Sequence, residues 1–214
     1  MMDGKLIEYI LLCVLFYLIG SIPTSYLFLK FKTGKDITAE GSGNSGALNY
    51  YEVSGSRLSG LLVLLIDFLK GFLPAFLFYN LAGFPFDYLL LPLVLIIAGH
   101  NFSVWLKFKG GRGLATAAGL SVAVCPALLI AWCVMFVIAY GVYRKVHFGN
   151  ITATVLLPVF ALLLGSFDTG LNGVATRNFG AFFSFTAIMS LLILLRHIKP
   201  FFGLIRGYKN RTPK

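Results

Sequence analysis

The sequence predicts an all-α integral membrane protein, a polytopic helical bundle of about seven transmembrane helices in one domain, residues 1–214. Of its 214 residues, 12% are charged and 58% are hydrophobic. The charged share is about half that of a soluble domain. Because such a chain cannot cover itself with polar groups, it must place much of its surface against lipid.

Seven apolar segments set the expected number of spans. Several approach the roughly 20 residues that a helix needs to cross a bilayer. The fourth is short and glycine-rich, so five or six spans are also compatible with the sequence. The segments lie at about residues 6–29, 58–81, 87–106, 113–125, 126–143, 151–167 and 179–196.

Basic residues predict the orientation of the bundle. The formal net charge is +10, and Lys and Arg gather near residues 30–57, 107–112, 144–145 and 196–214. The alternate loops near 80–86 and 125–126 carry no Lys or Arg, and the loop at 168–178 carries only Arg177. Since basic loops stay in the cytoplasm, seven spans place the N-terminus outside and the C-terminus in the cytoplasm. Membrane topology thus explains the charge, and nucleic acid is not an expected partner.

The cysteines and the N-terminal segment have ordinary interpretations. Cys13, Cys125 and Cys133 lie in or beside apolar segments without the spacing of metal ligands. We interpret them as small buried hydrophobic residues, and no metal site is predicted. The first apolar segment is too long for a signal peptide and is followed by no small-residue cleavage site. It is therefore interpreted as the first span.

Two glycine-rich runs predict a binding site for phosphate-bearing molecules. Residues 41–49 read Gly-Ser-Gly-Asn-Ser-Gly-Ala-Leu-Asn, and residues 107–113 read Lys-Phe-Lys-Gly-Gly-Arg-Gly. Glycine lets backbone N–H groups turn toward an anion. Short Ser and Asn side chains in the first run add donors, and the second run adds three cations. We interpret the runs as halves of one site, although basic residues beside a span commonly serve only topology or contact head groups.

Polar residues inside the apolar segments are further candidates. Pro23 should kink or loosen the first helix, either for packing or as a wall of the site. Asp67 and Lys70 share a helix face and can pair, as a structural ion pair or to orient loop residues. His100 is a base, a ligand or a packed interfacial histidine. Arg196–His197, at the end of the last span, could orient an acceptor hydroxyl or stabilise a phosphate.

In order and spacing, these stretches resemble the bacterial membrane glycerol-3-phosphate acyltransferases of the PlsY type, which use acyl phosphate as donor. The resemblance covers nearly the whole chain. The matching residues are Gly20–Pro23, Asp36, Gly41–Asn49, Asp67–Gly71, Gly99–His100, Phe108–Gly111, Gly113, Ala115–Thr116 and Arg196–His197.

The resemblance implies a seven-helix enzyme of the bacterial plasma membrane with its site facing the cytoplasm. Its reaction would move a fatty acyl group from acyl phosphate to the sn-1 hydroxyl of glycerol 3-phosphate, giving lysophosphatidic acid and phosphate for phospholipid synthesis. No metal or other cofactor is implied, and neither acyl-CoA nor acyl-carrier protein is the expected direct donor. Since acyl phosphate is already activated, the protein mainly positions two anions and neutralises developing charge.

The resemblance also implies roles for individual residues. The donor phosphate could itself accept the hydroxyl proton, while the histidine of the last span orients the acceptor. The expected catalytic residues are Ser42, Asn44, Arg112 and His197. The expected substrate-binding residues are Gly41, Gly43, Gly46, Asn49, His100, Lys109, Gly110, Gly111, Gly113 and Arg196.

Four positions depart from the family pattern and keep other functions open. Leu48 stands where the family usually has Thr, Glu52 where it has Arg, Arg112 where it has Lys, and Pro200 where it has Asn. An anion at position 52 would repel the phosphate of the acceptor, unless Lys199 or another cation compensates. A second hypothesis is therefore a divergent relative that acylates another hydroxyl compound or is inactive. A third is an anion transporter, which inverted repeats would support, and none is visible in the sequence.

Overall fold

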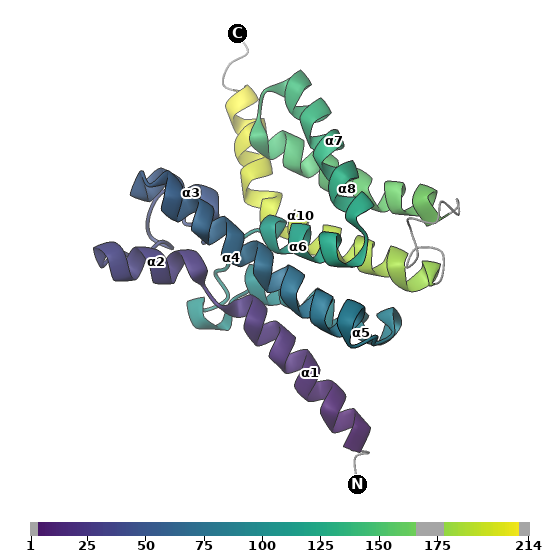
Figure 1. The fold of residues 1–214 in the computed structure, drawn as a ribbon. Coiled ribbons are helices and arrows are strands. Elements are labelled where there is room, and N and C mark those ends of the chain that lie inside the picture. The colour runs from purple at the N-terminus through teal and green to yellow at the C-terminus, as the bar shows by residue number, and fades with distance from the viewer. Residues whose placement is uncertain (1–3, 166–177, 210–214) are drawn as a thin grey trace. The chain divides into compact units, whose positions relative to one another are not determined.

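The computed structural model describes residues 4–165 and 178–209, with side chains described as far as residue 202 (Figure 1). Every regular element in these residues is a helix. The chain forms two compact units, Met1–Pro126 and Ala127–Lys214. The predicted single domain stays a prediction. Most of the predicted loop at 168–178 lies outside the described residues.

Six helices in the described residues are long and apolar enough to cross a membrane. The seventh predicted segment forms only the 11-residue helix α6, Leu114–Val124. At 1.5 Å per residue α6 is about 16 Å long, roughly half the thickness of the hydrocarbon core. The all-helical membrane fold is thus confirmed with one long span fewer than expected, and the short fourth segment accounts for the difference. The orientation of the bundle stays a prediction.

The first unit contains seven α-helices and two short irregular helical segments, η1 and η2. Their bounds are α1 Gly4–Ser21, α2 Thr24–Thr33, α3 Ala47–Ser54, α4 Arg57–Ala75, η1 Phe76–Leu81, α5 Phe86–Asn101, η2 Val104–Leu106 and α6 Leu114–Val124. The first apolar segment is therefore broken at Ile22–Pro23, as the proline predicts. Helices α2 and α3 end at Gly34 and Gly55, whose positive φ angles of 75° and 67° close the last turns.

Glycine allows two helix pairs of this unit to pack backbone to backbone. A Cβ atom on Gly71 of α4 would meet the carbonyl oxygen of Thr116 on α6, and one on Gly119 of α6 would meet that of Phe68 on α4. Between α1 and α5, Gly20 and Gly99 lie against the facing backbone in the same way. The close approach predicted for the small-residue segment after residue 113 is confirmed, since without a side chain these helices lose no contact distance.

A small apolar core attaches the long polar segment after α2 to the helices. Leu29, Ile37, Tyr50 and Val63 are fully buried together. They come from α2, the following loop, α3 and α4, so this core holds the loop between α2 and α3 in place. The outer faces of the helices are apolar and exposed, as Leu11 at 62% and Leu61 at 60% illustrate, which suits contact with lipid tails.

The second unit consists of three long helices, α7 Pro126–Tyr143, α8 Val146–Gly165 and α10 Phe179–Lys209. Helices α8 and α10 pack along a line of buried residues, including Leu157 on α8 and Phe185 on α10. Helix α7 is joined to α8 by a hydrogen bond from Trp132 Nε1 to Thr154 Oγ1, 3.1 Å long. The second unit thus places the end of α10, which carries Arg196 and His197, against α8.

Candidate active site

The first glycine-rich run is a loop held from inside by one side chain, that of Asn49. Its Oδ1 accepts a hydrogen bond from the Ser42 N–H at 2.8 Å, and its Nδ2 donates to the carbonyl oxygens of Glu40 at 3.2 Å and Asn44 at 2.9 Å. Asn49 is 2% exposed. The predicted substrate-binding residue Asn49 therefore shapes the loop, and the side chains around it must meet any ligand.

The glycines of this run serve two different purposes. Gly41 and Gly43 have positive φ angles of 54° and 68°, which side-chain-bearing residues rarely adopt. A Cβ on Gly46 would lie 2.7 Å from Asn44 Nδ2, so Gly46 leaves room for the amide side chain. Ser42 is exposed and Asn44 is half-buried, which places two predicted catalytic side chains at the surface of the loop.

Helix α3 starts directly after this run. Its N-cap is Gly46, and no side chain caps its first turn. The N-terminus of a helix attracts anions because its first N–H groups point outward along the dipole. By contrast, the N–H groups of Ser42 and Gly43 are bonded to Asn49 Oδ1 and the Glu40 carbonyl. The expectation that these amides face a ligand is therefore not met, and the start of α3 is the better placed donor.

Asp36, at the start of the same loop, connects it electrostatically to the second run. The backbone N–H and the hydroxyl of Thr38 both donate to Asp36 Oδ1 at 2.8 Å. These hydrogen bonds lower the pKa of the Asp36 carboxyl, and the positive charges of Lys30 and Lys109 lower it further. Since Lys109 belongs to the second run, the two glycine-rich loops lie within electrostatic range of each other in the first unit.

The second glycine-rich run is packed tightly onto the end of α5. The Gly110 N–H donates to the Asn101 carbonyl at 3.2 Å, and the Gly111 N–H donates to the His100 carbonyl at 2.9 Å. A Cβ on Gly110 would meet these carbonyls, and one on Gly111 would meet His100 Nε2. The N–H groups of Gly110 and Gly111 are thus used inside the protein, which differs from the expectation that they face a ligand.

The remaining residues of this run present its charge and begin the next helix. Lys107 and Lys109 are exposed, and Arg112 is half-buried. Lys107 has a φ angle of 51°, and Gly113, at the N-cap of α6, has one of 80°. The run therefore contributes side-chain cations on a tightly turned backbone, and Gly113 is required by its left-handed conformation.

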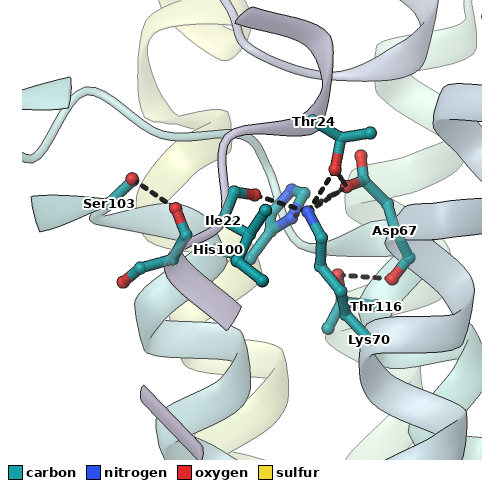
Figure 2. Close-up of polar contacts among 8 residues, drawn as sticks. Ile22, Thr24, Asp67, Lys70, His100, Ser103 and Thr116 are labelled. Atoms are coloured by element: carbon teal, nitrogen blue, oxygen red, sulfur yellow. Dashed lines mark hydrogen bonds and ion pairs between the residues drawn. The ribbon is translucent and has the colours of Figure 1, made fainter. Parts of the chain in front are cut away.

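A buried polar cluster lies beneath both loops (Figure 2). The Lys70 ammonium pairs with Asp67 Oδ1 at 2.6 Å and donates to the Ile22 carbonyl at 2.5 Å and to Thr24 Oγ1. The Thr24 hydroxyl in turn donates to Asp67 Oδ1 at 2.8 Å. Asp67 and Lys70 are 2% and 6% exposed. The predicted Asp67–Lys70 pair is confirmed, and it is centred on the break between α1 and α2.

Two further residues join α5 and α6 to this cluster. His100 Nδ1 lies 3.9 Å from Asp67 Oδ1, and Figure 2 shows the His100 ring beside the Lys70 ammonium. The Thr116 hydroxyl donates to the Asp67 carbonyl oxygen at 3.0 Å. The sequence analysis did not single out Thr24 as a member of this network. Its signal was a Thr directly after a proline inside a span, where freed backbone groups need polar partners.

Arg196 and His197 belong to the second unit. His197 is 1% exposed, and its Nδ1 lies 2.8 Å from the Ile193 carbonyl oxygen. Because a carbonyl oxygen only accepts, Nδ1 carries a proton. The ring of His147, which the sequence leaves as an interfacial residue, packs edge-on to His197 with centroids 6.3 Å apart. Arg196 is half-buried.

An apolar groove of about 360 Å³ lies beside His197. It is lined by Ile151, Leu194, His197, Ile198, Phe201 and Phe202. Pro200 lies inside α10 and does not end that helix. The predicted catalytic residues thus divide between the units, with Ser42, Asn44 and Arg112 in the first and His197 in the second.

Comparison with known proteins gives one consistent result. The profile of the family described as glycerol-3-phosphate acyltransferase matches residues 10–207. Glycerol-3-phosphate acyltransferases from Fusobacterium nucleatum and Chlorobaculum tepidum are 33% and 34% identical, covering 92% and 96% of this chain and 95% and 97% of their own lengths. A crystal structure of PlsY (YgiH), an integral membrane glycerol 3-phosphate acyltransferase in its glycerol 3-phosphate form, is 30% identical with a TM-score of 0.79 over 94% of this chain and 93% of that one.

A second crystal structure of PlsY, in the lysophosphatidic acid form, has a TM-score of 0.76 at 29% identity and the same coverage. The match therefore extends over the sequence and the fold, and it includes both glycine-rich loops and the end of α10. The chain belongs to the glycerol-3-phosphate acyltransferase family of integral membrane enzymes.

Proposed function

We propose that this protein transfers a fatty acyl group from acyl phosphate to the sn-1 hydroxyl of glycerol 3-phosphate. The observation that carries the proposal is the family match along residues 10–207. It is supported by the PlsY structures in glycerol 3-phosphate and lysophosphatidic acid forms, which correspond to an acceptor and a product. The products would be lysophosphatidic acid and inorganic phosphate.

The reaction is a direct acyl transfer. The acceptor oxygen attacks the carbonyl carbon of the acyl phosphate, a new ester C–O bond forms, and the C–O bond to the phosphate breaks. The hydroxyl proton passes to the departing phosphate. No side chain needs to form a covalent intermediate, so the protein contributes position and charge stabilisation.

The first unit supplies groups suited to hold phosphate. Lys109 and Arg112 provide positive charge, and the start of α3 provides N–H groups at the positive end of a helix dipole. Ser42 and Asn44 add a hydroxyl and an amide at the loop surface. In this proposal these groups bind the donor phosphate and stabilise the charge that grows on it as it leaves.

The second unit supplies the residue that orients the acceptor. With Nδ1–H donated to the Ile193 carbonyl, a neutral His197 ring presents Nε2 as an acceptor for a hydroxyl proton. Arg196 is the adjacent cation. The pattern of basic loops supports a site that faces the cytoplasm of a bacterial plasma membrane.

The test of this proposal is product formation by the purified protein in detergent with palmitoyl phosphate and glycerol 3-phosphate. Lysophosphatidic acid and phosphate in equal amounts are expected. Palmitoyl-CoA in place of palmitoyl phosphate should give no product. Absence of lysophosphatidic acid, from folded protein with intact donor, would overturn the proposed reaction.

A different acceptor is the alternative that one observation favours. Glu52 lies exposed on α3, the helix that starts at the first glycine-rich run, and its charge opposes an anionic acceptor. Glu52→Arg separates the two possibilities. If glycerol 3-phosphate is the acceptor, the variant should change its KM by less than threefold. If activity with glycerol 3-phosphate rises tenfold or more, the natural acceptor carries less negative charge.

A further inference from the structure

We propose that Lys70, together with Asp67, is a positioning residue for acyl transfer. The pair holds the chain segments that carry both glycine-rich loops. It does not contact the substrates in this proposal. The kinetic part of the inference rests on the proposed function, whereas the positioning itself can be measured separately.

The first role of Lys70 is to fix the break in the first apolar segment. Helix α1 ends at Ser21 and α2 begins at Thr24, so the carbonyls between them leave the regular helical ladder. Lys70 Nζ donates to the Ile22 carbonyl at 2.5 Å, and the buried Ser103 hydroxyl donates to the Ser21 carbonyl at 2.6 Å. Figure 2 shows both bonds meeting this one turn of the chain. These donors replace the partners that the proline removes.

From this break the order extends to the first loop. Thr24, which contacts both Lys70 and Asp67, is the first residue of α2. Helix α2 is a 10-residue helix that ends at Gly34, and the loop of Asp36 and Asn49 follows. The buried contact between Leu29 of α2 and Ile37 of the loop continues the connection. A shift of the break would therefore move α2 and the loop that it carries.

The same pair reaches the second loop by a separate path. Asp67 Oδ1 lies 3.9 Å from His100 Nδ1, and His100 Nε2 lies against Gly111 on the other side of the ring. The Asp67 carbonyl accepts from Thr116, in the first turn of α6 just after the loop. The loop is thus bounded at both ends by residues that contact Asp67.

The charge of the pair is the reason to infer more than a structural role. Taking two ions out of water is costly, and replacing a buried ion pair by apolar residues of similar size is often neutral or stabilising. Ionisable residues inside membrane spans are expensive in the same way. An amide and a methyl group could fill this site, but they could not hold the Ile22 carbonyl and Thr24 together with His100. The pair is suited to geometry rather than to stability.

The test compares Lys70→Met, Asp67→Asn and the double variant Asp67→Asn/Lys70→Met. Lys70→Met leaves a buried carboxylate without its partner and is expected to unfold at lower temperature. The double variant removes both charges at nearly constant volume, so it should fold with a Tm within a few degrees of wild type. Asn80→Ala is the matched control, since it removes a polar contact from η1 to the Ala123 carbonyl of α6 at the other end of the same helix pair.

Two readouts decide the inference. The first is kcat with palmitoyl phosphate and glycerol 3-phosphate, which should fall tenfold or more in the double variant and stay within twofold in the control. The second is hydrogen–deuterium exchange, which should become faster at residues 34–46 and 107–113 in the double variant and not in the control.

The exchange readout remains decisive if wild-type protein shows no acyl transfer, because that result overturns the proposed reaction and leaves the positioning testable. Wild-type exchange in both loops of the double variant would overturn the inference. A wild-type kcat would overturn it as well. A uniform rise in exchange over the whole first unit, accompanied by a lower Tm, would show that the pair only stabilises the fold and would also overturn it.

Discussion

Replacing Asn49 by alanine should open the first glycine-rich loop. The side chain makes three hydrogen bonds, one from the Ser42 N–H and two to the Glu40 and Asn44 carbonyls, at 2.8, 3.2 and 2.9 Å. A hydrogen bond contributes about 1 kcal/mol net, so the loop loses about 3 kcal/mol. Since 1.36 kcal/mol is a factor of ten, the ratio of ordered to open loop should fall about 100-fold.

The assay is kcat/KM for palmitoyl phosphate, measured beside the Tm of the same purified sample. We expect kcat/KM of Asn49→Ala to fall between tenfold and 100-fold. Leu48→Ala is the control, because the Leu48 side chain is 49% exposed and no hydrogen bond of the loop involves it.

Asn49→Asp sharpens this test. The carboxylate can still accept from the Ser42 N–H, but its second oxygen faces the Glu40 and Asn44 carbonyls, which offer no proton. At neutral pH it should therefore be less active than Asn49→Ala. Wild-type kcat/KM in Asn49→Ala, or higher activity in Asn49→Asp than in Asn49→Ala, would refute the assignment of these three bonds as the support of the loop.

Three further predictions concern the two loops. Gly111→Ala should lower kcat at least tenfold because its methyl group would displace the buried histidine ring at the end of α5, whereas Gly141→Ala, with open space around it, should stay within twofold of wild type. Ser42→Ala should lower kcat at least tenfold, about 1.4 kcal/mol or more, at an unchanged Tm, and wild-type turnover would remove Ser42 from the catalytic set. The pKa of Asp36 is lowered by hydrogen bonds from Thr38, so its contribution to stability is present above the unfolded pKa of about 4 and is lost as the pH falls through the lower folded value; a carboxyl ¹³C NMR titration should find a midpoint below 4, and Thr38→Ala should raise it.

Much of the fold followed from the sequence because lipid imposes simple rules. A composition of 58% hydrophobic and 12% charged residues leaves helices as the means of burying backbone polar groups in a bilayer. Pro23 indicated the break between α1 and α2, and the spacing of Asp67 and Lys70 indicated their ion pair. The count of long spans was less certain, since the helix after Gly113 ends at Val124 and hydropathy does not measure helix length.

The candidate site was harder to predict in its details, because glycine has two uses that look alike in a sequence. The glycines of both runs were expected to turn N–H groups toward a ligand. In the structure, the N–H groups of Gly43, Gly110 and Gly111 bond to backbone carbonyls of the protein itself. Gly110 and Gly111 are needed because the chain approaches His100 too closely for a side chain.

The sequence by itself determined the membrane-embedded helical class, the two glycine-rich runs, the paired Asp67 and Lys70, and the family. Each of these depends on composition or on short spacings along the chain, which local physics translates directly into structure. Only the tertiary structure decided what these residues contact. It showed that Asn49 supports the first loop and that Lys70 meets the Ile22 carbonyl, 48 positions away in the chain. Such partners come from different helices, and their meeting depends on how those helices pack, which no spacing within one segment records.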